Sequence, residues 1–319
     1  MIKTLRTICL AVLVATPAMA ADFPEKPVRI VVPYNAGGAV DYVGRVTAAG
    51  LSKALGENFV VENRAGAAGS IGIQYVASAK PDGYTLLMTS VTSNAITSAI
   101  KPESAGYDLK QDLTPVGIVG LVPLLLVAAN NVPANTVEEL IAYAKSQDQS
   151  LTYASSGVGS TEHLGAVVFG EAAGIELEHI PYTGGAPAMA DVVAGRVQLM
   201  VATLPTALPQ IEAGMVKALA IALPERVATL PDVPSAPEVG LDSFNVASVY
   251  GLLAPKDIDA AALDTLKTAL HGVVTDAAFA AQMNERGIVP STETPDQAAA
   301  AYAKEIDVWS ERISKIEIE

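Results

Sequence analysis

The stretch that decides the fold covers residues 28–41 and reads VRIVVPYNAGGAVD. It begins with a short run rich in β-branched residues, which predicts a buried strand. Pro33 and the small residues 35–38 end that strand, and apolar residues recur at helical spacing from Val40 onward. This order of elements, a strand followed by a glycine turn and the start of a helix, makes a candidate anion site. The reason is that the first N–H groups of a helix lack internal partners and lie at the positive end of its dipole.

The same order occurs again further along the chain. A predicted strand at 58–61 is followed by the glycine-rich segment 66–72 and a helix that extends to about Ala79. A third strand, 84–88, leads into residues 89–94, which we expect to form a hydroxyl-rich loop. In an open parallel sheet, loops of this kind line the crevice at the carboxyl ends of the strands.

The rest of the chain predicts a second α/β unit inserted into the first. Residues 115–129 are apolar but broken by glycine and proline, which favours buried strands over a membrane span. Further strand–loop–helix units follow, and one of their helices begins with a capping box at 136–139. We therefore expect two lobes, with residues 21–121 and 245–319 in lobe 1 and residues 122–244 in lobe 2.

The first twenty residues are predicted to be a cleavable signal peptide. Lys3 and Arg6 precede an apolar core, and residues 18–20 fit a small-residue cleavage site. This predicts an exported, periplasmic protein. The single cysteine, Cys9, lies inside this segment, so disulfides, thiol chemistry and thiolate metal sites are not expected.

The charge balance is acidic, with 20 basic and 34 acidic residues and a formal net charge of −14. Such a balance argues against nucleic acid and anionic lipid as partners. It would not help to attract an anionic ligand either. Capture of an anion would have to be local, by oriented N–H groups.

Catalysis, metal binding and nucleotide binding find little support. His163, His179 and His271 are too few and too scattered for a metal site, and there is no G-x-S-x-G elbow. The glycine loops do not match G-x-G-x-x-G, and there is no Walker lysine. We expect no catalytic residue, no cofactor and no metal. His163 could contact a ligand or make a structural hydrogen bond, and Arg64 could serve an anion loop or a structural ion pair.

Asp41 and Arg45 lie one turn apart at the start of the first helix. They suit an i,i+4 ion pair with the acid at the positive end of the dipole. A carboxylate beside an anion site would repel the ligand directly. We therefore expect Asp41 to hold the N–H groups of its own loop, or a bridging water.

Taken together, these motifs resemble the Bug-type, TctC-like family of extracytoplasmic solute receptors of tripartite tricarboxylate transporters. The motifs that carry the resemblance are residues 33–38 with Asp41 and Arg45, 61–64, 66–72, 81–84, 157–160 with 163–164, 179–182 and 251–255. They span essentially the whole chain after the first twenty residues. The resemblance implies a type II periplasmic-binding-protein fold of the α/β class, with two α/β lobes joined by two crossing strands.

The resemblance also implies which residues bind the ligand. The family holds a ligand carboxylate at the first two glycine loops, largely through backbone amides and bridging waters. Carried over to this chain, the carboxylate site consists of Tyr34, Gly37, Gly38, Ala67, Ala68, Gly69 and Ser70. The more distant contacts come from Ser90, Thr92, Ser156, Ser160, Thr183 and Thr203, with Asp41 as the support of the site.

One departure from the family bears on the ligand. Many members carry an aspartate near the cleft at the position of Ala202. The missing charge predicts a ligand without an amino group, such as a di- or tricarboxylate or an aromatic acid.

The function implied by the resemblance is a periplasmic receptor that captures a small organic carboxylate between its lobes. It would deliver this ligand to a membrane permease with one large and one small subunit. We expect a monomer that does not bind nucleic acid. Two alternatives remain open at this point, a periplasmic sensor that presents its ligand to a signalling system and an enzyme that acts on an organic acid.

Overall fold

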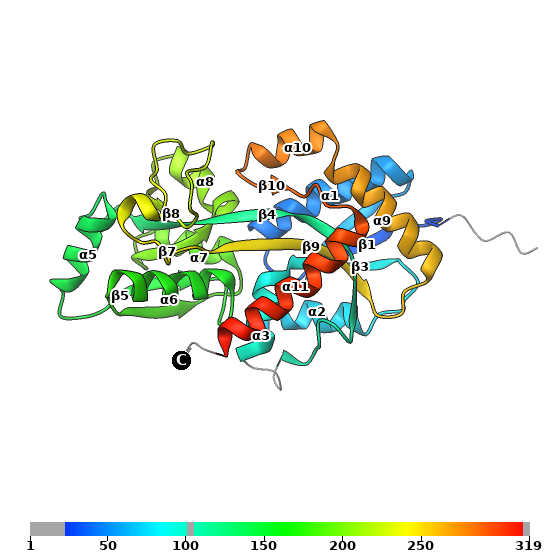
Figure 1. Ribbon diagram of the computed structural model, residues 1–319, viewed down its shortest axis with the longest axis horizontal. Coiled ribbons are helices and arrows are strands. Elements are labelled where there is room, and N and C mark those ends of the chain that lie inside the picture. Colours follow the sequence, from blue (N-terminus) through cyan, green and yellow to red (C-terminus); the bar gives the residue numbers. More distant parts are fainter. Residues whose placement is uncertain (1–22, 101–104, 315–319) are drawn as a thin grey trace, which may run out of the picture.

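The computed structural model describes residues 23–100 and 105–314. The predicted signal peptide lies outside the described residues. Among the described residues, one sheet extends through both halves of the molecule, with helices packed around it (Figure 1).

The order of the strands in this sheet is β2-β1-β3-β9-β4-β7-β5-β6, and β8 and β10 pair with β4. The strands are β1 (Val28–Val32), β2 (Phe59–Asn63), β3 (Thr85–Ser90), β4 (Leu113–Ala129), β5 (Leu151–Ser155), β6 (Leu177–Pro181), β7 (Leu199–Thr203), β8 (Val216–Ile221), β9 (Ala247–Pro255) and β10 (Val289–Pro290).

The helices lie between and after these strands. They are α1 (Ala39–Leu55), η1 (Ala67–Gly69), α2 (Ser70–Ala77), α3 (Val91–Ile100), α5 (Val137–Lys145), α6 (Thr161–Ala173), α7 (Gly185–Val193), α8 (Leu204–Glu212), η2 (Pro237–Val239), α9 (Ala260–Val274), α10 (Ala277–Asn284) and α11 (Pro295–Ile313). Thr136 caps α5 where the sequence predicts, and Thr294 caps α11, because each hydroxyl accepts the N–H of the residue three positions later. Gln297 completes the capping box of α11, whereas Glu139 accepts the Asn135 N–H instead of completing the predicted box of α5.

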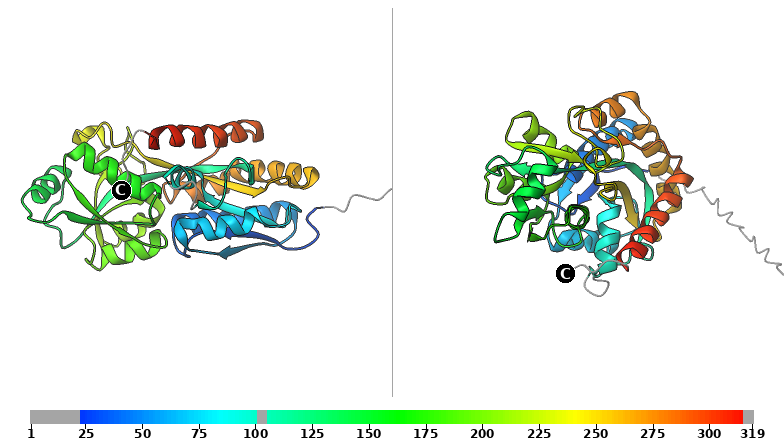
Figure 2. Two further views of the ribbon diagram at one scale, coloured as in Figure 1. Left: turned by 90° about the horizontal axis from the view of Figure 1, so that it is seen from below. Right: turned by 60° about the vertical axis from the view of Figure 1, so that its left-hand side comes forward.

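Two long strands connect the lobes. The apolar segment predicted as several strands is one strand, β4, of 17 residues. Its first part, Leu113 to Pro123, pairs with β9, and its second part, from Leu124 onward, pairs with β7 and β8. Both β4 and β9 run between the halves in Figures 1 and 2. The predicted fold, two α/β lobes joined by two crossing strands, is confirmed.

The two lobes repeat one arrangement. In lobe 1, β1 lies between β2 and β3, and in lobe 2, β5 lies between β6 and β7, with all of these pairs parallel. The strands lead into α1, α2 and α3 in the first lobe and into α6, α7 and α8 in the second. The connections at the carboxyl ends of these strands are the segments that carry the predicted site residues.

One local prediction is wrong. The segment 89–94 is not a loop, because α3 begins at Val91, directly after β3. Ser90 explains the difference, since its hydroxyl accepts the Ser93 N–H at 3.0 Å and so caps the new helix. Hydroxyl side chains that suggest a loop are equally suited to a helix start.

The apolar cores divide the chain close to the lobe boundaries that we propose at 121/122 and 244/245, except that Val122 packs with lobe 1 and Val246 with lobe 2. One cluster of buried apolar residues comes entirely from the segment between Leu124 and Val246. Two other clusters come from the remainder of the chain, except for Leu164 of α6, which packs among residues of lobe 1. Leu164 therefore joins the lobes at the start of α6.

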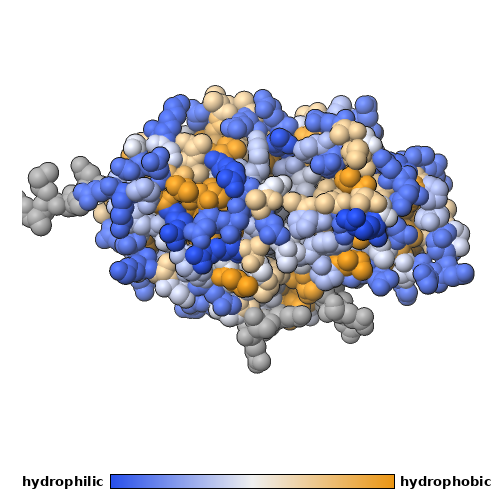
Figure 3. Space-filling model, turned by 180° about the vertical axis from the view of Figure 1, so that it is seen from behind, coloured by the Kyte–Doolittle hydropathy of each residue, from blue (hydrophilic) through white to orange (hydrophobic). Residues whose placement is uncertain are grey.

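The surface is mostly polar, with small apolar patches on the face shown in Figure 3. The exposed large apolar side chains are Val60, Ile71, Leu121, Met215 and Val289. Within residues 23–100 and 105–314, none of the helices combines the length and the apolar character needed to cross a bilayer.

Candidate functional site

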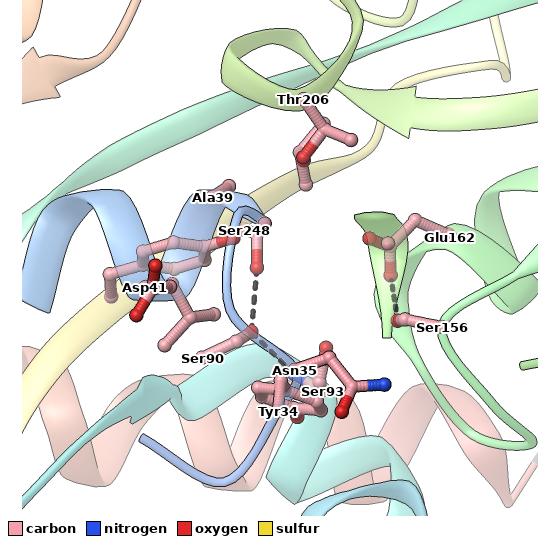
Figure 4. Close-up of a pocket in the computed structure, with 15 residues that line it drawn as sticks. Tyr34, Asn35, Ala39, Asp41, Ser90, Ser93, Ser156, Glu162, Thr206 and Ser248 are labelled. Carbon is pink, nitrogen blue, oxygen red and sulfur yellow. Dashed lines mark hydrogen bonds between the residues drawn. The ribbon is translucent and has the colours of Figure 1, made fainter. Parts of the chain in front are cut away.

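A narrow cavity lies between the lobes, where the connections after their strands meet (Figure 4). It is small, with about 20 Å³ open to the centre of a water-sized sphere, which is room for about one water molecule. The lining residues are Tyr34, Asn35, Gly38, Ala39, Val40, Asp41, Ser90, Ser93, Ser156, Glu162, Gly185, Thr203, Thr206, Ser248 and Tyr250. They come from both lobes and from the crossing strand β9.

Helix α1 begins at this cavity. Gly38 is its N-cap residue, and no side chain caps this end of the helix. The first N–H to bond along the helix belongs to Tyr42, which donates to the Gly38 carbonyl at 3.0 Å. The N–H groups of Ala39 and Val40 come before it and have no acceptor within the helix. Since both residues line the cavity, the positive end of α1 faces it.

Four more helices begin at the same place. The lining includes one residue from the first turn of each of α3, α6, α7 and α8, namely Ser93, Glu162, Gly185 and Thr206. No lysine or arginine is among the lining residues. The cavity therefore offers backbone N–H groups, hydroxyl groups and the positive ends of five helix dipoles, which favours an anion.

Asp41 holds the first glycine loop together. Its Oδ2 accepts the Gly37 N–H at 3.0 Å, and its Oδ1 accepts an amide N–H of Asn63 at 2.9 Å. Arg45 forms the expected ion pair with it at 2.9 Å. Burial raises the pKa of Asp41, but the hydrogen bonds from Arg45, Gly37 and Asn63 outweigh burial and hold that pKa below its ordinary value. The prediction that Asp41 holds the N–H groups of its own loop is confirmed.

The second glycine loop contacts the opposite lobe. Ala67 and Ala68 have φ of 47° and 52°, a left-handed conformation that costs alanine about 1–2 kcal/mol per residue. A Cβ atom placed on Gly157 would lie 3.2 Å from the Ala68 Cβ. The loop is thus held in a strained form against the polar loop that precedes α6. Strain of this kind collects at functional sites.

Tyr34 links the second loop to the cavity. A Cβ atom on Gly69 would lie 3.3 Å from the Tyr34 hydroxyl. That hydroxyl is buried, and it makes no hydrogen bond of ordinary geometry among the described residues, although Thr89 and Ser93 lie near enough to lower its pKa. Burial raises the pKa of Tyr34, and the nearby Tyr107 and Glu162 raise it further. The side chain is therefore a neutral O–H group at the cavity wall, with hydroxyl neighbours in Thr89 and Ser93.

The structure closes the lobes on each other around the cavity. The Asn35 Nδ2 donates to the Thr183 Oγ1 at 2.7 Å, and the hydroxyls of Ser93 and Thr161 are 2.7 Å apart. Each of these bonds joins one lobe to the other. The cavity is consequently the interior of a closed cleft.

The predicted site residues fall into three groups. Those that line the cavity are Tyr34, Gly38, Asp41, Ser90, Ser156 and Thr203. Those outside the lining, in the loops and helix starts that carry the site, are Gly37, Ala67, Ala68, Gly69, Ser70, Ser160 and Thr183. Thr92 forms the third group. It lies at the start of α3, but its hydroxyl is used away from the cavity, where it donates to Glu305 of α11 and accepts the Val249 N–H at 2.9 Å.

Sequence reasoning missed several lining residues. They are Asn35, Ala39, Val40, Ser93, Glu162, Gly185, Thr206, Ser248 and Tyr250. Ser93, Glu162, Gly185 and Thr206 could have been found from their position in the first turn of a helix that follows a strand. Ser248 and Tyr250 carried no local signal, since they reach the cavity only because β9 crosses beside it.

Two alternatives left open by the sequence are decided by contacts. Arg64 pairs with Glu62 at 2.5 Å, and its guanidinium lies 3.6 Å from the centre of the Tyr75 ring. It therefore makes the structural ion pair. His163 accepts the Gly159 N–H at 3.1 Å and stacks on His179, with 4.1 Å between ring centres. Neither side chain lines the cavity.

A buried carboxyl group stands in the cavity wall. Glu162 is 6 % exposed, and its Oε2 accepts the Ser156 hydroxyl at 2.6 Å. Burial raises the pKa of Glu162 above its ordinary value, against the lowering effect of the bonds from Ser156 and Ser160. Ala202 therefore does not leave the cavity free of acidic side chains, because Glu162 from α6 lines it.

The described residues contain no group of three or more His, Cys, Asp and Glu side chains that could hold a metal ion.

The fold and the cavity are those of a two-lobed binding protein with a site between its lobes. The chain belongs to the tripartite tricarboxylate transporter family of receptors, TctC, whose family model matches residues 43–318.

Solved structures of similar proteins agree with this assignment. The periplasmic binding protein BugD is 36 % identical with a TM-score of 0.86, and the match covers 92 % of this chain and 98 % of BugD. The R. palustris protein Rpa4515, solved with adipate, is 33 % identical with a TM-score of 0.88 and coverage of 92 % and 98 %. MatC (Rpa3494) from Rhodopseudomonas palustris, solved with bound malate, is 30 % identical with a TM-score of 0.85 and coverage of 91 % and 100 %.

Proposed function

We propose that this protein is a periplasmic receptor for a small dicarboxylate, which it encloses between its two lobes. The observation that carries the proposal is the convergence of five helix N-termini on one closed cavity without lysine or arginine in its lining. Oriented N–H groups at helix starts can bind a carboxylate without a cationic side chain.

The cavity offers separate groups for the two ends of such a ligand. The start of α1, with the N–H groups of Ala39 and Val40, is suited to one carboxylate. The hydroxyls of Ser93, Thr206 and Tyr34 are suited to the other end. Two related proteins of this fold are described with adipate and with malate, both dicarboxylates, which supports this ligand class.

The closed form gives the binding a mechanism. The ligand contacts residues of both lobes, so it favours the closed form only through contacts that the open form lacks. The receptor would then present its ligand to the large and small membrane subunits of a tripartite transporter. This last step rests on the family, whose members are described as transporter receptors. A receptor role requires no chemical step on the ligand.

Calorimetric titration with malate, adipate and a tricarboxylate such as citrate tests the proposal. Gly38→Val should abolish binding, because the new side chain occupies the cavity at the start of α1. Its backbone tolerates the change, since φ at Gly38 is −84°. Gly272→Val is the matched control, since Gly272 lies in α9 with no atom within 4 Å of an added Cβ. No binding of any of these acids to the wild-type protein would refute the proposal, as would equal binding by the two variants.

A further inference from the structure

The buried carboxyl of Glu162 occupies a position in the cavity that the proposed function does not explain. Glu162 projects from the first turn of α6 and faces the start of α1 across the cavity (Figure 4). Its two oxygens differ in their surroundings. Oε2 accepts the Ser156 hydroxyl, whereas Oε1 lies 3.6 Å from the position of a Cβ on Gly185, at the cavity side of α7.

No cation compensates this carboxyl among the cavity residues. The ionisable side chains that line the cavity with it are Tyr34 from the β1–α1 connection, Tyr250 from β9 and Asp41 from α1. Both tyrosines are neutral, because burial raises the pKa of each. Asp41 is already bonded to Arg45, Asn63 and Gly37. The segments that α3, α7 and α8 contribute to the lining carry no ionisable side chain.

A bound dicarboxylate would therefore place two negative charges near an acid that has no counter-charge. An ionised Glu162 would add a third negative charge in a buried space, where repulsion is weakly screened. A protonated Glu162 removes that repulsion. It also supplies an O–H donor where a ligand oxygen needs one. The Ser156 hydroxyl donates to Oε2, and Ser160 and the Glu162 N–H also bond to the carboxyl group. We place the proton on Oε1, the oxygen on the side of Gly185.

We propose that Glu162 binds the ligand in its protonated form and donates a hydrogen bond from Oε1 to a ligand carboxylate, so that capture of the ligand takes up one proton. This inference rests on the proposed function. It identifies Glu162 as the residue that makes the site select a ligand with a second carboxylate over a ligand with an ammonium group. Burial already favours the protonated form in the closed cavity, which is the direction that the proposal requires.

The sign of the pH dependence follows directly. If the bound state holds one proton more than the free state, affinity is highest at low pH and falls by up to about tenfold per pH unit as pH rises. Malate keeps both carboxylates ionised between pH 6 and pH 8, so its own titration contributes little in this range.

The test uses the full mature chain and malate, titrated by calorimetry at pH 6, 7 and 8 in two buffers of different ionisation enthalpy. Glu162→Gln retains the shape of the protonated acid, with an acceptor for Ser156 and an N–H donor toward the cavity. Glu171→Gln is the matched control, because Glu171 lies exposed at the other end of the same helix. L-Aspartate, which adds an ammonium group to the same carbon framework, is titrated in parallel.

We expect wild type and Glu171→Gln to take up close to one proton per malate and to lose affinity as pH rises. Glu162→Gln should bind malate with nearly the same affinity at all three pH values and without proton uptake. The inference is overturned if malate binds wild type with no proton uptake and no pH dependence. It is also overturned if wild type binds aspartate more tightly than malate and Glu162→Gln loses that binding, since Glu162 would then be ionised. Failure of malate, adipate and citrate to bind wild type at any pH refutes the proposed function, and this inference with it.

Discussion

Replacing Asp41 by alanine tests how the first glycine loop is held. Asp41 is 5 % exposed, and its carboxylate receives bonds from the Gly37 N–H and the Asn63 amide. Hydrogen bonds to a buried charged group contribute about 1.5–3 kcal/mol each. The Arg45 side chain is 54 % exposed, so its ion pair adds only about 0.3–0.5 kcal/mol. Alanine avoids the cost of burying a carboxylate, and this gain offsets part of the lost hydrogen bonds. We therefore expect Asp41→Ala to lower the free energy of unfolding by about 3 kcal/mol.

The assay is thermal unfolding followed by circular dichroism at pH 7, with Asp264→Ala in the exposed face of α9 as control. A loss of about 3 kcal/mol corresponds to a fall of about 5 °C in the melting temperature of a chain of this size. The folded-state pKa of Asp41 is lowered, so its contribution is complete above about pH 4 and is lost as pH falls through the folded pKa. The difference between wild type and Asp41→Ala should shrink accordingly below pH 4. Equal melting temperatures for the two variants at pH 7 would refute the reasoning.

Three further substitutions separate binding from stability. Thr183→Ala removes the bond from Asn35 that joins the lobes, worth about 0.5–1.5 kcal/mol, so calorimetry should show a two- to tenfold loss of affinity for malate; unchanged affinity would contradict it. Thr92→Val leaves a backbone N–H of β9 unpaired and should cost about 1–3 kcal/mol of stability in denaturant unfolding with unchanged affinity, whereas a selective loss of affinity would place Thr92 in the site. Gly72→Ala brings a Cβ within 2.9 Å of Pro33 and should cost about 1–3 kcal/mol in the same assay; a stability equal to wild type would show that the loop can move.

Much of the fold followed from local patterns in the sequence. The first strand, glycine turn and helix were recognisable because a β-branched run, Pro33 and the helical spacing from Val40 each act within a few residues. The length of β4 was not predictable in this way. Its second half is paired by β7 and β8, which lie more than seventy residues later in the chain, and only the folded sheet makes one strand of it.

The part of the site formed by the glycine loops of lobe 1 was predictable, whereas the part formed by lobe 2 and β9 was much less so. Asp41 could be understood from its position one turn before Arg45, and its bond to the Gly37 N–H bears this out. Thr92 and Ser93 are neighbours in a hydroxyl-rich segment, yet their side chains point to α11 and to the cavity side, respectively, because they lie in a helix rather than a loop. Glu162 looked like an ordinary first-turn acid. Its burial comes from residues of other elements that line the same cavity, which no local pattern in the sequence shows.

The most direct test of the central claim is a crystal structure of the protein with malate. The account predicts that one malate carboxylate lies within hydrogen-bond distance of the Ala39 and Val40 N–H groups, in a cleft closed by the bond between Asn35 and Thr183. Malate bound elsewhere, or bound in the cleft with neither carboxylate at the start of α1, would contradict it.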